Sequence, residues 1–191
     1  MVATRVTDDR PLTIEDLDLI PDDGNRYEIM QGELIVSPAP NDTHQLVLGR
    51  LYIALLSAAN LSNFGLVRLG PRDVRLSESD VVEPDLFAFR NVQRGQSTER
   101  VFYGAPAFVV EIMSPSSAVN DRVRKASLYM NTKVEEYWVV DPFAKRILVH
   151  LLNRQGANPE IFIDRPVRSH IIPTFEVDLT ELFAPEPESG E

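Results

Sequence analysis

The segment AFVVEIMS, residues 107–114, constrains the fold of this chain more than any other. It is short, apolar and rich in β-forming residues, and Pro106 and Pro115 bound it at its two ends. A run with these properties is typical of a central strand that is buried on both faces. Its only charged residue is Glu111. The chain must therefore cover this strand with other elements and compensate one carboxylate inside it.

The rest of the chain predicts suitable elements in the order strands, helix, strands, helix, strands. Two β-rich runs flank Gln31-Gly32 and predict a hairpin. The other predicted elements are a short helix over 13–19, a long helix over 44–60 capped by 41–43, strands within 66–77 and 81–90, a long helix over 119–131, two strands around 141–142 and a short helix over 177–183. This order predicts an α/β protein with a mixed β-sheet core flanked by helices.

Length and composition fit one ordinary domain. The chain has 191 residues, 43% of them hydrophobic, and no cysteine, which excludes thiol catalysis and cysteine-based metal clusters. We expect a single domain over 1–191, with an acidic leader over 1–25 and a disordered tail over 185–191. The longest nearly apolar run, 51–59, is far shorter than the roughly 20 residues that span a bilayer. Because no apolar segment follows the first residues, we expect no signal peptide and a cytoplasmic protein without membrane contact.

The net charge of −10 argues at first against a nucleic-acid partner. The acids, however, are concentrated at the two ends. Residues 1–36 carry nine acids and three bases, and residues 176–191 carry six acids and no base. The middle of the chain holds 16 of the 19 cations and sums to +2. The charge distribution therefore allows DNA as a partner without indicating it.

Two acids in apolar strand segments require an explanation. Glu111 lies within FVVEIM, and Asp85 follows Pro84 and precedes LFAF. A carboxylate in such surroundings is costly unless a cation, a metal or hydrogen bonds compensate it. If the two strands are neighbours, both carboxylates meet at one edge of the sheet and form a site for magnesium, which suits phosphodiester hydrolysis. The alternative is that each acid pairs with an arginine or faces solvent at a strand end.

Lys125 lies in the helix that follows the Glu111 strand. One interpretation is that it leans over the sheet edge, where it orients water or neutralises phosphate. The other is a surface ion pair with Asp121, because a spacing of four puts both residues on one helical face. The sequence favours neither interpretation over the other.

Several blocks in order resemble one known family. They are RYEIMQGELIVSPAPNDTH, VVEPDLFAF, GAPAFVVEIMSPSS, DRVRKASLYMNTKVEEYWVVDP and VDLTELF. Together they resemble the Uma2 family of restriction endonucleases, a branch of the PD-(D/E)XK nuclease superfamily. The resemblance covers nearly the whole chain. It implies a restriction-endonuclease-like fold and a nuclease centre that depends on magnesium or manganese.

The resemblance also implies roles for individual residues. Asp85 and Glu111 match the two metal-binding acids of the superfamily. The usual lysine, two residues after the second acid, is replaced here by Met113, and Lys125 would supply that lysine from the next helix. Glu33 and His44 match further characteristic positions. Glu33 could be a third carboxylate that binds the metal or assists through water, or an exposed hairpin acid. His44 could touch phosphate or hold Glu33, or be a structural histidine in the capping region of its helix.

These observations predict a metal-dependent endonuclease that hydrolyses phosphodiester bonds of DNA. On the helix of Lys125, Arg122 shares its face and would bind phosphate, whereas Arg124 lies further round. The rival interpretation is a non-catalytic binding or regulatory protein that keeps the nuclease scaffold and acts through dimerisation or a partner surface. A homodimer is compatible with both interpretations. Met113 and the acidic ends favour the rival most.

Overall fold

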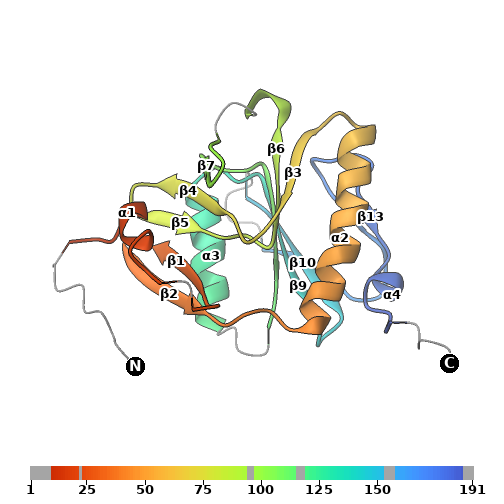
Figure 1. Ribbon diagram of the computed structural model, residues 1–191. Coiled ribbons are helices and arrows are strands. Elements are labelled where there is room, and N and C mark those ends of the chain that lie inside the picture. The colour runs from red at the N-terminus through yellow and green to blue at the C-terminus, as the bar shows by residue number, and fades with distance from the viewer. Residues whose placement is uncertain (1–9, 22, 94–96, 115–118, 153–157, 187–191) are drawn as a thin grey trace.

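The computed structural model describes residues 10–21, 23–93, 97–114, 119–152 and 158–186, with side chains of helix α3 from residue 123 onward. A six-stranded sheet forms the centre of the molecule. Figure 1 shows helix α2 on one side of this sheet and, on the other, helix α3 with a second, five-stranded sheet. The predicted α/β class, with a mixed sheet flanked by helices, is confirmed.

The predicted central strand lies in the middle of the six-stranded sheet. The strand order is β11-β10-β9-β8-β6-β3, and β8 pairs parallel with β9 and antiparallel with β6. The strands are β3 (Gly65–Leu69), β6 (Leu86–Arg90), β8 (Phe108–Ile112), β9 (Glu136–Asp141), β10 (Arg146–Leu151) and β11 (Glu160–Phe162). Strand β6, which begins directly after Asp85, and strand β8, which contains Glu111, are therefore neighbours in space.

The five-stranded sheet begins with the predicted hairpin. Its order is β2-β1-β5-β4-β7, with β4 and β7 parallel. The strands are β1 (Arg26–Met30), β2 (Glu33–Ser37), β4 (Asp73–Ser77), β5 (Asp80–Val82) and β7 (Val101–Tyr103). Gln31 and Gly32 join β1 to β2 with φ values of 55° and 77°. Both values lie in the left-handed region that a two-residue hairpin turn requires, which explains the glycine.

The helices match their sequence signals closely. They are α1 (Ile14–Leu17), α2 (Asp42–Leu61), α3 (Val119–Asn131) and α4 (Leu179–Leu182). The remaining elements are a 3-10 turn (Asn91–Gln93) and a two-stranded ribbon of β12 (Val167–Arg168) and β13 (Glu176–Val177). The Asn41 side chain caps α2 by accepting the His44 N–H at 2.9 Å. In the described part of the chain, no helix combines the length and the apolar character needed to cross a membrane.

Alternate residues of the central strands build two separate cores. Leu86, Phe108 and Trp138 face α2 and belong to one hydrophobic cluster. Phe87 and Val109 face α3 and the five-stranded sheet and belong to the other. This alternation follows from the two-residue period of a strand. Asp85 and Glu111 have the same parity as Phe87 and Val109, so both carboxylates point toward α3.

The two ends of the chain are described only in part. A capping box of Thr13 and Asp16 begins α1, as the sequence predicts, although the helix ends before residue 19. Residues 1–9 of the predicted leader and 187–191 of the predicted tail lie outside the described residues. The expected disorder of that tail and the single-domain organisation stay predictions.

Candidate active site

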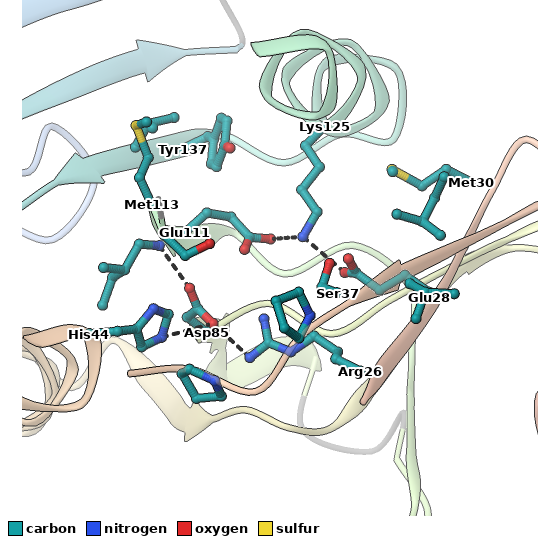
Figure 2. A pocket seen from close by; sticks show the side chains of 17 residues that line it. Arg26, Glu28, Met30, Ser37, His44, Asp85, Glu111, Met113, Lys125 and Tyr137 are labelled. Atoms are coloured by element: carbon teal, nitrogen blue, oxygen red, sulfur yellow. Dashed lines mark hydrogen bonds and ion pairs between the residues drawn. The ribbon is translucent and has the colours of Figure 1, made fainter. Parts of the chain in front are cut away.

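A pocket lined by charged and apolar side chains opens between the six-stranded sheet, helix α3 and the hairpin of β1 and β2. Figure 2 shows its lining, in which acidic and basic side chains from all three elements point toward one another. The titratable side chains in this lining are Arg26, Glu28, His44, Asp85, Glu111, Lys125 and Tyr137. All three residues predicted to carry the chemistry, Asp85, Glu111 and Lys125, therefore lie in one pocket.

Asp85 lies directly before β6 and is almost completely buried. Its Oδ2 accepts the Ile112 N–H at 2.7 Å, and its Oδ1 lies 2.8 Å from Arg26 Nη2. The pairing of Leu86 with Val110 continues by one residue to set Asp85 opposite Glu111. Burial alone would raise the pKa of Asp85, but His44 and Arg26 lower it to about 2. Asp85 is therefore a fixed negative charge at neutral pH.

Glu111 lies on β8 and faces Lys125 across the pocket. Its Oε1 accepts bonds from Lys125 Nζ at 2.9 Å and from the Tyr129 hydroxyl at 2.8 Å. No described residue donates a hydrogen bond to its other oxygen, Oε2. Burial raises the pKa of Glu111 to about 7; Lys125 opposes this rise and the Asp85 carboxylate adds to it. The described residues therefore leave Oε2 for a ligand, and an added positive charge would stabilise the ionised form of Glu111.

Lys125 reaches the pocket from α3, as expected if it leans over the sheet edge toward the two acids. Its Nζ lies 2.9 Å from Glu111 Oε1 and 2.9 Å from Glu28 Oε1. Although burial disfavours its charge, Glu111 and Glu28 raise the pKa of Lys125. The Asp121 side chain, the partner in the alternative interpretation, lies outside the described residues. Met113, at the usual lysine position, packs instead beside the core cluster under α3.

Glu28 and Arg26 are two charged residues that the sequence analysis missed. Both belong to β1, and both are among the pocket-lining residues labelled in Figure 2. Arg26 lies between Asp85, at 2.8 Å, and Glu83, at 3.5 Å. The available signal was the same one that identified Glu111, a charge inside a β-rich apolar run, here RYEIM. The sequence does not show that β1 lies across the pocket from β8.

Glu33, predicted as a third carboxylate at the metal, does not line the pocket. It lies at the turn end of the hairpin, where its exposed side chain pairs with Arg124 Nη2 at 2.8 Å. The register of the hairpin explains this, because Glu33 pairs with Met30 whereas Glu28 lies two residues further along β1. The structure thus supports the alternative of an exposed hairpin acid for Glu33, and Glu28 provides the third carboxylate of the pocket.

His44 does reach the pocket, from the first turn of α2. Its side chain is buried, and Nε2 lies 3.4 Å from Asp85 Oδ1. Neither ring nitrogen makes a hydrogen bond within the described part of the chain. Its Nε2 faces the Asp85 carboxylate, and its Nδ1 has no described hydrogen-bond partner and can bind a further polar ligand. It does not hold Glu33, which lies at the other end of the hairpin.

The two arginines of α3 differ in what the structure describes. The Arg122 side chain lies outside the described side chains, so its predicted contact with phosphate stays a prediction. Arg124 pairs with Glu33 and is absent from the described lining of the pocket. This placement agrees with the expectation that Arg124 lies further round the helix than Lys125.

The donors in the pocket fit a hard divalent cation bound in part by water. Within the described ranges, no group of three or more His, Cys, Asp or Glu side chains forms a complete metal cage. Magnesium, however, commonly uses one or two carboxylates and keeps several waters. Asp85, directly before β6, lies opposite Glu111 on β8, and the two supply that pair. The residues present therefore fit magnesium or manganese.

Comparisons with known proteins identify the family and the fold of this chain. The family model of Uma2, described as “Putative restriction endonuclease”, matches residues 14–182. No curated protein matches the sequence. Among solved structures, the fold is similar to “a putative nuclease belonging to DUF820” from Anabaena variabilis, with a TM-score of 0.78 and 18% identity over 91% of this chain and 98% of that one. This likeness confirms the predicted restriction-endonuclease-like fold.

Proposed function

Since this chain belongs to the Uma2 family, whose model matches most of its length, we propose that it is a metal-dependent endonuclease that hydrolyses phosphodiester bonds of DNA. One observation carries the proposal. Asp85 and Glu111 face each other in one pocket, and the Lys125 ammonium lies 2.9 Å from Glu111. Two carboxylates and a lysine are the groups that metal-assisted phosphoryl hydrolysis needs in one place.

In the proposed reaction, Asp85 and Glu111 hold Mg²⁺ or Mn²⁺. The bound ion would activate water and stabilise the negative charge that develops on the phosphate. Asp85 is ionised and fixed by Arg26 and the Ile112 N–H, so it offers a preformed ligand. Glu111 supplies its Oε2. Lys125 orients the attacking water or stabilises the phosphate charge, and the His44 imidazole, which faces Asp85 from α2, would contact the same phosphate.

The charge around the pocket supports a requirement for the cation. Glu28, Asp85 and Glu111 bring three carboxylates, against the two cations Arg26 and Lys125. A polyanion entering this pocket would meet net negative charge unless a divalent ion were bound first. DNA is the proposed substrate because the family description names restriction endonucleases, and most cations of the chain lie in its middle part.

Plasmid cleavage tests the proposal directly. We expect cleavage with Mg²⁺ or Mn²⁺ and none with EDTA, and we expect Mn²⁺ to raise the melting temperature by binding the folded state. E111Q and D85N should abolish both effects, whereas E33Q, outside the pocket, should keep both. A protein that binds neither Mn²⁺ nor DNA would contradict the proposal. It would favour the non-catalytic alternative, and measuring the solution mass would then test dimerisation.

A further inference from the structure

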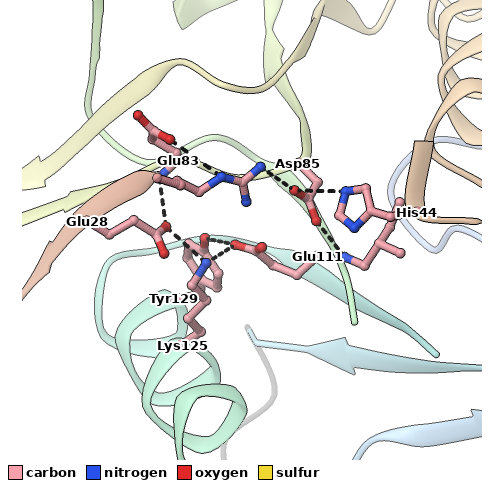
Figure 3. Close-up of polar contacts among 9 residues, drawn as sticks. Glu28, His44, Glu83, Asp85, Glu111, Lys125 and Tyr129 are labelled. Carbon is pink, nitrogen blue, oxygen red and sulfur yellow. Dashed lines mark hydrogen bonds and ion pairs between the residues drawn. The ribbon is translucent and has the colours of Figure 1, made fainter. Parts of the chain in front are cut away.

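One lysine in the pocket is shared by two carboxylates. Lys125 Nζ lies 2.9 Å from Glu111 Oε1 and also 2.9 Å from Glu28 Oε1. Figure 3 shows the lysine between these two acids, with one acid on each sheet. Glu111 is a proposed metal ligand, whereas no role has yet been given to Glu28. The question is why a second, buried acid contacts the same ammonium.

Glu28 is held in place independently of the lysine. It lies within β1 with only 2% of its surface exposed. Its Oε1 accepts the Glu83 N–H at 2.8 Å, so the backbone that follows β5 fixes the carboxylate. Its position thus depends on the five-stranded sheet and not on Glu111, which belongs to the six-stranded sheet. A change at Glu111 should leave Glu28 where it is.

A divalent ion would change the balance at Lys125. Bound to Asp85 and Glu111, the ion would neutralise Glu111 and repel the nearby ammonium. Arg26 cannot replace Glu28 as an anchor because it is itself a cation and already faces Asp85 at 2.8 Å. Among the described side chains, Glu28 is the one other acid that contacts Lys125. It is therefore the group that can retain the lysine in the pocket.

We propose that Glu28 is a positioning residue that takes over the Lys125 ammonium when Glu111 binds the metal. The inference rests on the proposed function, since it assumes a metal at Asp85 and Glu111. Glu28 itself binds no metal in this scheme. Its effect is exerted through Lys125, which keeps a fixed place beside the scissile phosphate throughout the metal-bound state.

Competitive acetylation of lysines tests this directly. The chain has three lysines, and the exposed Lys133 and Lys145 serve as internal references for Lys125. The variant is E28Q, because a Gln carbonyl can still accept the Glu83 N–H while the negative charge is lost. The matched control is E33Q, which removes a hairpin acid that pairs with α3 outside the pocket. Labelling is measured by mass spectrometry with and without Mn²⁺.

We expect Lys125 in the wild type and in E33Q to label slowly, with or without Mn²⁺. In E28Q, adding Mn²⁺ should raise the labelling of Lys125 relative to the two references by about tenfold. Lys125 then has no negatively charged partner left and keeps only a hydrogen bond to the neutral Gln carbonyl. The affinity for Mn²⁺, measured by titration, should fall by less than about twofold. With plasmid, E28Q should lower kcat by about tenfold or more and change KM little, since a misplaced group costs rate.

Three outcomes would overturn the inference. Labelling of Lys125 in E28Q that matches E33Q at saturating Mn²⁺ would show that Glu28 does not retain the lysine. A large loss of Mn²⁺ affinity in E28Q would make Glu28 a metal ligand instead. Both results leave the proposed function intact if the wild type binds Mn²⁺ and cleaves. A wild type that binds no Mn²⁺ would overturn both proposals together.

Discussion

Two glutamates on adjacent strands of the central sheet, Glu136 fully buried and Glu111 mostly buried, have different surroundings. Glu136 on β9 faces the side of α2, and Glu111 on β8 faces the side of α3. Glu136 accepts hydrogen bonds from four neutral donors, which are Trp138 Nε1 at 2.6 Å, Ser169 Oγ at 3.0 Å, His170 N at 2.9 Å and Ile171 N at 3.1 Å. Glu111 instead accepts from a lysine and a tyrosine and opens into a pocket.

The comparison shows that burial alone does not identify a functional acid. Neutral donors satisfy Glu136 on both oxygens, and three of them come from one segment, 169–171. That carboxylate therefore fixes the chain after β12 against the sheet. Glu111 leaves Oε2 without a described donor and lies opposite a second acid. An incompletely satisfied carboxylate beside another one is the arrangement that favours a cation.

The largest expected effect is the loss of nuclease activity in E111Q, which would distinguish the functional Glu111 from the structural Glu136. E111Q should lower nuclease activity at least ~100-fold, because it removes a metal ligand. Its free energy of unfolding without metal should be unchanged or higher by about 1 kcal/mol, since Lys125 keeps Glu28 and repulsion with Asp85 is relieved. Plasmid cleavage and urea denaturation measure the two quantities. A stability loss of about 3 kcal/mol or more would show that Glu111 is structural, like Glu136.

Replacing Glu136, on the α2 side of the sheet, by Gln should lower the stability of the protein. E136Q turns one acceptor oxygen into an NH₂ group that meets buried donors, so we expect a loss of about 3 kcal/mol in the free energy of unfolding. Activity per folded molecule should stay near that of the wild type at a temperature where the variant is folded. If E136Q lost activity while its melting curve was unchanged, Glu136 would have a functional role and would not be the structural counterpart of Glu111.

The pH dependence of stability should differ between wild type and E111Q. Burial raises the pKa of Glu111 to about 7 from its ordinary 4.5, so folding favours its protonated form. The stability that this proton contributes is present below pH 4.5 and is lost as the pH rises to 7. We expect the wild type to lose on the order of 1 kcal/mol more than E111Q between pH 5 and pH 8. Glu83, whose pKa burial also raises to about 7 despite Arg26, should give E83Q a similar but separate effect.

The smallest expected effect concerns DNA affinity on the α3 side. Arg122 is predicted to contact phosphate and Arg124, paired with Glu33, is not. In Ca²⁺, R122A should bind a short duplex more weakly, and the slope of log affinity against log salt should fall by about 0.9. R124A is the matched control and should keep the wild-type slope. Equal slopes for wild type and R122A would remove Arg122 from the phosphate site.

Local patterns in the sequence predict most of the elements correctly. Gln31-Gly32 determines the hairpin turn, Asn41 caps α2, and the alternation around Glu111 defines β8 as a central strand. Each signal acts over a few residues, through backbone conformation, capping or the two-residue period of a strand. The sequence analysis predicted that Asp85 and Glu111 meet if their strands are neighbours, and β6 and β8 do pair.

The third carboxylate of the pocket is a feature that local sequence patterns did not predict. Glu33 and Glu28 belong to the same hairpin and face the same side, but the register places only Glu28 in the pocket.

The sequence by itself determined which residues carry charge inside apolar strands and which face of each strand they occupy, because both follow from local composition and a period of two. Only the tertiary structure decided which of those charges meet. Lys125 contacts Glu28 across 97 residues of chain, and Arg26 contacts Asp85 across 59. Contacts at such separations depend on how the two sheets and α3 pack together, and the packing is a property of the whole core.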